Sequence, residues 1–393
     1  MLRQLQLTRG HGFALWQLGF RPFYLLAAIF AALSVGSWTA RFAGYLPHGG
    51  YPSPHVDPFW HAHELIFGYT FAVAAGFLFA IVRSWTHRPT PTGPALAAIA
   101  ALWLAARVLV FTPWSAAVAA TNLAFSLAVA AGIGVPLWQA RDRHNYFFIG
   151  LVLLISTALV LFHLATLDLV ALPAWAGVQL GIDVVLLLIA AVAGRVVPIY
   201  TNKAVPGARA RRSQNVERLA MGGLAVLLAA DLFRLSGLAQ IVLTAALAIV
   251  HAWRLYKWDF RSALRVPLLW VLYIAYAWIP VHLALRATYE AGWTARPLAI
   301  HAFTVGAIGG LTMAMMIRTA RAHTGRALEA DGYDIASCVL LAAAAVIRVF
   351  WPLIQPGYHV QATVYSGALW SAAFVVFVLR HGPALVRPSR SAP

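Results

Sequence analysis

The chain has 393 residues, of which 61% are hydrophobic and only 10% are charged, and its mean hydropathy is +0.75. Soluble domains carry roughly 25% charged residues, so this composition excludes an ordinary soluble protein. An apolar run of about 20 residues can cross a bilayer as a helix. Such runs occur at about residues 20–44, 60–82, 94–112, 115–139, 145–166, 174–194, 217–235, 237–256, 265–286, 296–317, 333–352 and 360–380. We therefore predict an all-α integral membrane protein of about twelve transmembrane helices, with residues 1–393 in one transmembrane domain.

The formal net charge of +17 is divided unevenly between the two predicted membrane faces. If the N-terminus is cytoplasmic, six of the 29 Lys and Arg residues lie in or near the external loops, and all the others lie on the cytoplasmic side. The six are Arg41, Arg107, Arg234, Arg286, Arg296 and Arg348. This asymmetry predicts a multi-pass protein of the bacterial inner membrane with both termini in the cytoplasm. It explains the positive charge by topology and by contact with anionic membrane lipid, and it argues against a nucleic-acid partner.

Cysteine usage restricts how a cofactor could be attached. Cys338 is the one cysteine, so no disulfide can form within the chain. No Cys-x-x-Cys-His sequence is present, which excludes covalent attachment of a c-type haem. Any haem would have to be held without covalent bonds, as haem b is.

The helices show signs of a threefold repeat. Two similar four-residue stretches begin at Phe162 and Val281, in the first helices of a second and a third group of four. The second helices of the three groups end in Arg83, Arg195 and Arg318. Fixed-period similarity is the usual sign of a repeated structural unit. It predicts units at about 20–139, 145–256 and 265–380, arranged as three four-helix groups in a ring.

Apart from His251, the histidines within or at the predicted spans lie in the external half of the bilayer, and five of them are candidate ligands: His61, His63, His163, His282 and His301. Titratable side chains are costly in lipid and usually face a cofactor, a metal or a water-filled cavity. His61 and His63 are two residues apart, so about 200° separates them around a regular helix. They therefore serve two different sites, or one of them faces an aqueous vestibule. The alternative is that the polar and aromatic residues at 60–64 form an interfacial collar, and that His163 and His282 form bonds between helices.

Several charged residues near these histidines are further candidates for function. Arg107, Arg234 and Arg348 lie near the external ends of their helices, where a guanidinium suits the propionate groups of haem. The alternatives are that they extend towards the interface, or that Asp231 pairs with Arg234. Glu64 is placed to orient a histidine or to transfer protons, and the buried Asp183 is a second candidate for proton transfer. The glycines of the second helices leave space for a flat cofactor or for close helix packing.

Four motifs give the chain a resemblance to the NnrS family. They are Gly19-Phe20-Arg21-Pro22-Phe23, Trp60-His61-Ala62-His63-Glu64 with Phe67-Gly68, Gly194-Arg195-Val196-Val197-Pro198-Ile199-Tyr200-Thr201-Asn202, and Ala322-His323-Thr324-Gly325-Arg326. The resemblance covers nearly the whole chain, with one departure at His87, where the family pattern has glycine. It implies a bacterial inner-membrane protein with twelve spans that binds haem, with copper as a second candidate cofactor. It also implies a role in denitrification and in resistance to nitric oxide.

The chain also has a distant likeness to the catalytic subunit of haem–copper oxidases and nitric oxide reductases. That fold has twelve spans in three groups, and histidines from spans two and ten hold its low-spin haem. Here those spans carry His61 or His63 and His301. The oxidases place metal-binding histidines on spans six and seven, and this chain has none there. His163 and His282 are the available substitutes for a second haem or a copper ion.

These observations together predict a b-type haem protein whose axial ligands are His301 and one of His61 and His63. The expected small-molecule partner is nitric oxide, which partitions into lipid. If the protein is an enzyme, the reaction is reduction of nitric oxide to nitrous oxide, with electrons from quinol or a periplasmic redox protein. The main alternative is a non-catalytic haem protein that binds nitric oxide and protects the cell, and a third class is a membrane transporter.

Overall fold

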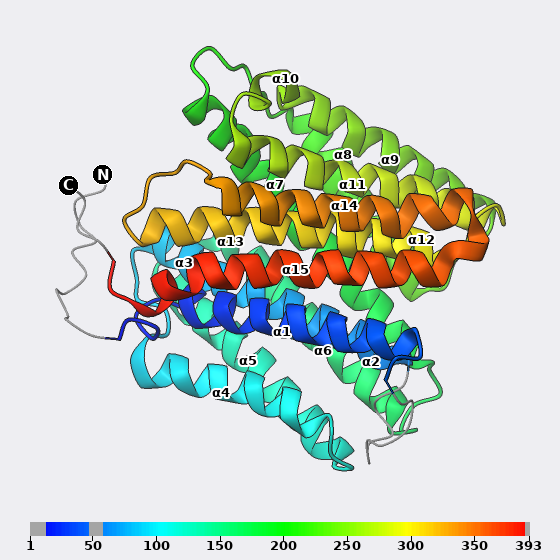
Figure 1. Ribbon diagram of the computed structural model, residues 1–393, viewed down its shortest axis with the longest axis horizontal. Helices are drawn as coiled ribbons and strands as arrows, with labels where there is room; N and C mark the ends of the chain where they lie inside the picture. Colours follow the sequence, from blue (N-terminus) through cyan, green and yellow to red (C-terminus); the bar gives the residue numbers. More distant parts are fainter. Residues whose placement is uncertain (1–12, 47–57, 390–393) are drawn as a thin grey trace.

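The computed structural model describes residues 13–46 and 58–389, which form helices and no strands (Figure 1). The first predicted unit contains α1 (Phe20–Phe42), α2 (Pro58–His63), η1 (Glu64–Thr70), α3 (Phe71–Thr86), α4 (Gly93–Leu109) and α5 (Ser115–Gln139). The second contains η2 (Arg143–Asn145), α6 (Tyr146–Thr166), α7 (Ala174–Ala204), α8 (Gln214–Leu232) and α9 (Leu238–Lys257). After α10 (Phe260–Ala263), the third contains α11 (Pro267–Glu290), α12 (Arg296–His301), η3 (Ala302–Gly309), α13 (Gly310–His323), α14 (Gly332–Ile354), η4 (Pro356–Tyr358) and α15 (His359–Val386).

The predicted class, an all-α multi-pass membrane protein, is confirmed. Ten helices of the described residues are long and apolar enough to cross a membrane. Two of these, Phe59–Thr86 and Arg296–His323, contain an internal π-helical segment, and we call these two the compound helices. The other two predicted spans are also helices. However, α4 has only 17 residues, and α8 carries the charged residues Glu217, Arg218 and Asp231. Both lie at the edges of the bundle, roughly in line with the other helices (Figure 1).

The helices pack in the pattern of a closed ring. The last helix of each predicted unit lies against the first helix of the next: α5 against α6, α9 against α11, and α15 against α1. This arrangement agrees with three four-helix groups in a ring, although the repeat of structure within each group stays a prediction. Most residues of α3, α7 and α13 are buried, so the second helix of each group lies towards the centre.

The two ends of the bundle differ in what they contain. We call the end where α1 begins and α15 ends the terminal end. There the segment before α1 is bound to the end of α15, because the backbone N–H of Ala14 donates to Val386 O at 2.8 Å. Arg21 there is completely buried, and its guanidinium donates to the carbonyls of Leu385 and Arg387 at 2.9 and 2.7 Å. At the opposite end, α2 and α12 begin the two compound helices (Figure 1). We call this the histidine end because His61, His63 and His301 lie on those two short helices.

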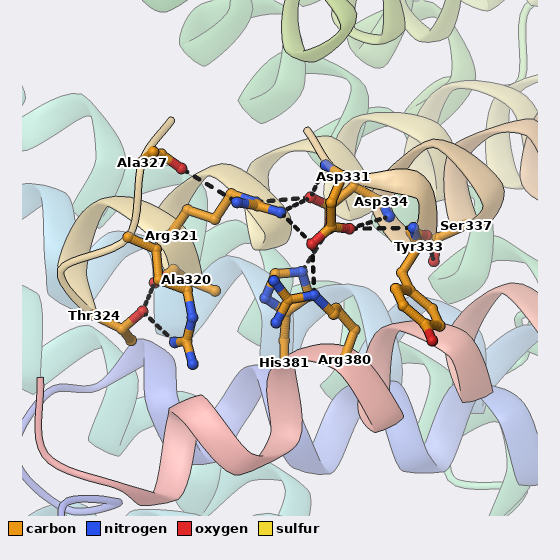
Figure 2. Close-up of polar contacts among 11 residues, drawn as sticks. Ala320, Arg321, Thr324, Ala327, Asp331, Tyr333, Asp334, Ser337, Arg380 and His381 are labelled. Atoms are coloured by element: carbon orange, nitrogen blue, oxygen red, sulfur yellow. Dashed lines mark hydrogen bonds and ion pairs between the residues drawn. The ribbon is translucent and has the colours of Figure 1, made fainter. Parts of the chain in front are cut away.

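A buried ionic cluster joins α13, α14 and α15 near the terminal end (Figure 2). Asp334 accepts from Arg321 Nε at 2.7 Å and lies 2.7 Å from His381 Nε2. Asp331 caps α14, and Arg380 Nε donates to it at 2.6 Å. Burial opposes ionisation of Asp331, but the bonds from Arg380 and the Asp334 backbone outweigh it and hold the pKa of this carboxyl below its usual value. Opposite charges within the cluster therefore compensate one another and hold α13, α14 and α15 together.

We expect His381→Ala to destabilise the protein by about 1–3 kcal/mol, because Asp334 loses one of its two buried side-chain partners. The measurement is thermal unfolding in detergent. Replacement of the exposed His87, which lies at the end of α3, provides the control. Equal melting temperatures for the two variants would show that the His381–Asp334 contact adds nothing to stability.

Candidate functional site

The two histidine-bearing helices share an unusual feature. In both, the chain changes from α-helical to π-helical hydrogen bonding directly after the histidines, at Glu64 in η1 and at Ala302 in η3. Thr70 Oγ1 donates to Leu65 O, five residues earlier, at 2.7 Å. π-Helical segments are rare and occur mainly at functional sites, because the extra residue in the turn redirects nearby side chains. The π-helical segments therefore lie in the same two helices that the histidines made candidates for function in the sequence.

A cavity of about 260 Å³ lies between these two segments, and we call it the His61–His301 cavity. Its walls come from α1, α2 with η1, α7, α12 with η3, α14 and α15. Three of its lining residues are polar candidates from the sequence, His61, His301 and Arg348, and three are tryptophans, Trp38, Trp175 and Trp370. Its size is close to the lower end of the roughly 300–1,000 Å³ typical of small-molecule sites, and such sites are mostly apolar with a few polar groups.

The two imidazoles in this cavity are held in defined orientations. His301 Nδ1 lies 2.6 Å from the carbonyl oxygen of Pro297, so Nδ1 carries the proton and donates it. That bond leaves the lone pair on Nε2, which is the arrangement found in most metal-binding histidines. The ring of His61 stacks on Trp38, with centroids 4.1 Å apart and an interplanar angle of 20°. His61 Nδ1 is buried and finds no hydrogen-bond partner among the described residues.

The three arginines predicted to bind propionates are separated by the fold. Arg348 lines the His61–His301 cavity, and no ion pair joins it to another described residue. Arg107 is buried beside Glu64, with its Nε 2.7 Å from Glu64 Oε2. Arg234 is exposed just beyond the end of α8. Of the three, Arg348 alone has its charge placed to meet an anionic group in this cavity.

His63 faces a second cavity of about 270 Å³, which we call the His63–His163 cavity. Its ring lies 5.1 Å from that of His163 at an angle of 69°. The lining is more polar than that of the first cavity and includes Ser115, Thr166 and Asp168. The prediction that His61 and His63 point to different places therefore agrees with the structure, since His61 lines the first cavity and His63 lines the second.

Glu64 lies at the centre of a buried network behind the second cavity. One carboxylate oxygen is 2.8 Å from His63 Nδ1, and the other forms the ion pair with Arg107. Arg107 also donates to Asn122 Oδ1 at 2.5 Å. Glu64 is completely buried, so its charge requires this arginine. The arrangement matches the predicted orienting role of Glu64, whereas transfer of protons would require the ion pair to change.

Asp183 is also held in an ion pair, away from both cavities. Arg286 lies between it and Asp231: Nη1 is 3.5 Å from Asp183 Oδ1, and Nη2 contacts Asp231 Oδ1. Gln179 donates to Asp183 at 3.0 Å and accepts from Arg296 at 3.1 Å. Asp231 therefore contacts Arg286, in place of the contact with Arg234 that the sequence left open. The network joins α7, α8 and α11 to the start of α12.

His282 and the glycines have packing roles in this structure. His282 Nδ1 lies 2.7 Å from Ala299 O, which ties α11 to α12, and His282 lines neither of the two cavities. A side chain at Gly306 would collide with Trp278, and one at Gly309 would come within 2.5 Å of Trp370. These glycines permit close contact with large side chains, so of the two predicted reasons for them the structure favours packing. Among the described residues, no three His, Cys, Asp or Glu side chains gather as a metal site.

Comparison with known families agrees with the four motifs. The model of the NnrS protein family matches residues 14–389, nearly the whole chain. The protein belongs to the NnrS family. This confirms the family predicted from the sequence and links this membrane protein to the nitric oxide response. A search of curated proteins finds no match.

The four NnrS motifs have different structural roles. The motif at 60–68 carries the histidines of both cavities and the start of η1. The motif at 19–23 supplies Arg21, which binds the end of α15. In the motif at 194–202, Asn202 exchanges two hydrogen bonds of 3.0 Å with the backbone of Ala210. In the motif at 322–326, Arg326 donates to Thr324 at 2.8 Å. Of the four motifs, only the one at 60–68 lines the two histidine-containing cavities, and the contacts given for the other three lie towards the terminal end.

The sequence missed several residues that shape the site. Trp38 was not a candidate, although it stacks on His61. Trp175 lines the first cavity and lies 4.3 Å beneath the guanidinium of Arg296. Both tryptophans lie near the ends of predicted spans, where aromatic residues are common for interfacial reasons. No signal in one sequence separates them from ordinary interfacial tryptophans.

Proposed function

We propose that this NnrS protein is a b-type haem protein of the bacterial inner membrane that acts in nitric oxide metabolism. The observation that carries the proposal is the His61–His301 cavity, where two imidazoles and one arginine without an ion pair share a mostly apolar space. Histidines suit iron, and an arginine suits the propionate groups of the porphyrin. His61 and His301 would hold the iron, and Arg348 would pair with a propionate.

The residues fit this cofactor on three structural grounds. The Nδ1 bond of His301 leaves Nε2 available as a ligand. Trp38 fixes the plane of the His61 ring, so little side-chain freedom would be lost on binding. The tryptophans and aliphatic side chains around them supply apolar walls for the porphyrin. When bound, haem would supply an iron centre that could exchange one of these two imidazoles for nitric oxide.

The distribution of charge supports a definite orientation in the membrane. Basic side chains concentrate towards the terminal end, in the loop that precedes α8 and in the last turns of α13. By the positive-inside rule, we place that end in the cytoplasm and the histidine end in the periplasm. The haem would then lie in the periplasmic half, where a quinol or a periplasmic redox protein could deliver electrons.

Two activities follow from a haem in this position. In the first, two nitric oxide molecules, two protons and two electrons give nitrous oxide and water, with Glu64 and Asp183 as candidate proton carriers. In the second, the protein binds nitric oxide without turnover and protects the cell. The ion pairs that hold both carboxylates favour the second activity. Copper at His63 and His163 remains an additional proposal, and it would need a ligand beyond these two imidazoles.

The test begins with purified protein. We expect a Soret band and a pyridine haemochrome of the b type, whereas a transporter without a cofactor would show neither. Anaerobic incubation with nitric oxide and an artificial electron donor then separates the two activities, because only an enzyme releases nitrous oxide continuously. Colourless, iron-free protein that still protects cells from nitric oxide would refute the proposal.

We expect Arg348→Leu to retain haem but to lower its midpoint potential by on the order of tens of millivolts, because a nearby positive charge favours the reduced iron. Redox titration followed by the Soret band measures this shift. Arg234→Leu removes an exposed arginine at the end of α8 and is the matched control, for which we expect no shift. Identical midpoint potentials for the two variants would show that Arg348 does not lie at the haem site.

A further inference from the structure

A third cavity lies along the same helices as the His61–His301 cavity, further from the histidine end. It has a volume of about 80 Å³, and we call it the apolar cavity. Its walls come mainly from the three second helices: Val73 and Phe77 on α3, Val185 and Leu188 on α7, and Leu311 and Met315 on α13. It therefore lies where the three groups of the ring meet.

The apolar cavity and the His61–His301 cavity follow one another along these helices. Thr70 lines both cavities. On α7 the lining passes from Ile182 in the first to Val185 in the second, and from η3 to α13 it passes from Ile308 to Leu311. Each of these steps is three residues, about one helical turn. The two cavities are thus adjacent along one axis, with Thr70 at their boundary.

The lining chemistry shows which kind of molecule fits. Apart from three hydroxyl residues, every side chain lining the apolar cavity is a hydrocarbon or a methionine. Thr70 already donates its hydroxyl to Leu65 O at 2.7 Å, and Thr312 donates to Ile308 O at 2.6 Å. A buried water needs two to four polar partners, and apolar cavities that lack them stay dry and bind benzene or xenon. This cavity offers the hydroxyl of Tyr24 and little else, so it favours an uncharged, apolar guest.

We propose that the apolar cavity binds one small uncharged gas molecule and holds it beside the His61–His301 cavity. The identification of that gas with nitric oxide rests on the proposed function, whereas the preference for an apolar gas rests on the lining alone. A guest held there lies about one helical turn from the adjoining cavity that contains the two histidines. The same lining opposes ions and polar solutes, for which a wall without hydrogen-bond partners is a barrier.

Xenon tests the site without any reference to haem. A structure of the wild-type protein under xenon pressure is expected to show xenon between α3, α7 and α13, next to Thr70. Ala74→Phe, which places a ring in the cavity, is expected to abolish that density. Ala101→Phe, at an exposed position of α4, is the matched control and should leave the xenon in place. A wild-type cavity that contains ordered water or a lipid acyl chain, and no xenon, would overturn the proposal.

Gas rebinding tests the connection between the two cavities. After flash photolysis of carbon monoxide from reduced protein, we expect Ala74→Phe to slow bimolecular rebinding about tenfold, a change of about 1.4 kcal/mol in the barrier. Ala101→Phe should rebind at the wild-type rate. If xenon binds but both variants rebind alike, the cavity is not on the route to the histidines and the proposal fails. If the protein contains no haem, the proposed function fails, and the xenon experiment alone decides whether the gas site exists.

Discussion

His301→Ala is expected to lose most of its haem, or to convert the remainder to a different spin state. Removal of an outer-shell partner of a metal ligand already weakens metal binding about 10–100-fold, and loss of the ligand itself should cost at least as much. His61→Ala should have a similar effect, because its ring faces the same cavity. The measurements are the haem-to-protein ratio by pyridine haemochrome and the optical spectrum of each purified variant.

The controls for this prediction come from histidines that the structure places elsewhere. His63→Ala should keep the parent spectrum, because His63 lines the other cavity. His282→Ala should keep it as well, although it loses the bond between α11 and α12 and should be less stable. If His63→Ala loses haem and His61→Ala does not, the haem belongs in the His63–His163 cavity. If every variant keeps the parent spectrum, these histidines are not ligands.

Glu64→Ala is expected to destabilise the fold by about 3–5 kcal/mol, because it leaves the buried Arg107 without its carboxylate partner. The loss also removes the oxygen that lies 2.8 Å from His63 Nδ1, so that this imidazole loses its fixed orientation. Unfolding in detergent with increasing denaturant, followed by circular dichroism, measures the change. Glu329→Ala alters an exposed carboxylate, and we expect it to remain within about 0.5 kcal/mol of the parent.

A double variant separates the two reasons why Glu64 could matter. Replacement of both charged partners, as in Glu64→Leu with Arg107→Met, should recover much of the stability, because apolar pairs often replace buried ion pairs at little cost. If the double variant is as unstable as Glu64→Ala, the carboxylate contributes through a contact other than Arg107. If it is stable but the spectrum or activity changes, the pair has a functional role beyond folding.

The membrane class and the position of the helices were readily predicted from the sequence. A span needs only length and continuous hydrophobicity, and both are local properties of the chain. The two less certain spans, α4 and α8, are those in which one requirement is weak: the first is short, and the second carries charged residues. The ring of three groups was predicted from two short similar stretches and the positions of three arginines. The contacts between α5 and α6, α9 and α11, and α15 and α1 agree with that prediction.

The candidate site was predicted in part. The divergence of His61 and His63 follows from helical geometry alone, because residues two positions apart on an α-helix point about 200° apart. Helical geometry does not predict that His301 shares a cavity with His61 instead of His63. That choice depends on the rotation of α2 and on which helices lie beside each face. From the sequence, Arg107, Arg234 and Arg348 were equally good candidates to bind propionates, because each has a similar depth in its helix. The fold places them in three different environments.

The sequence by itself determined that the chain crosses a membrane many times, that it belongs to the NnrS family, and that its candidate histidines lie towards one end. Only the tertiary structure decided which of those residues meet. It joined His61, His301 and Arg348 around one cavity, and it bound Glu64 and Asp183 to arginines from other helices. The physical reason is that depth is set along each helix by hydrophobicity, whereas the partners of a side chain depend on how distant helices are rotated and packed against one another.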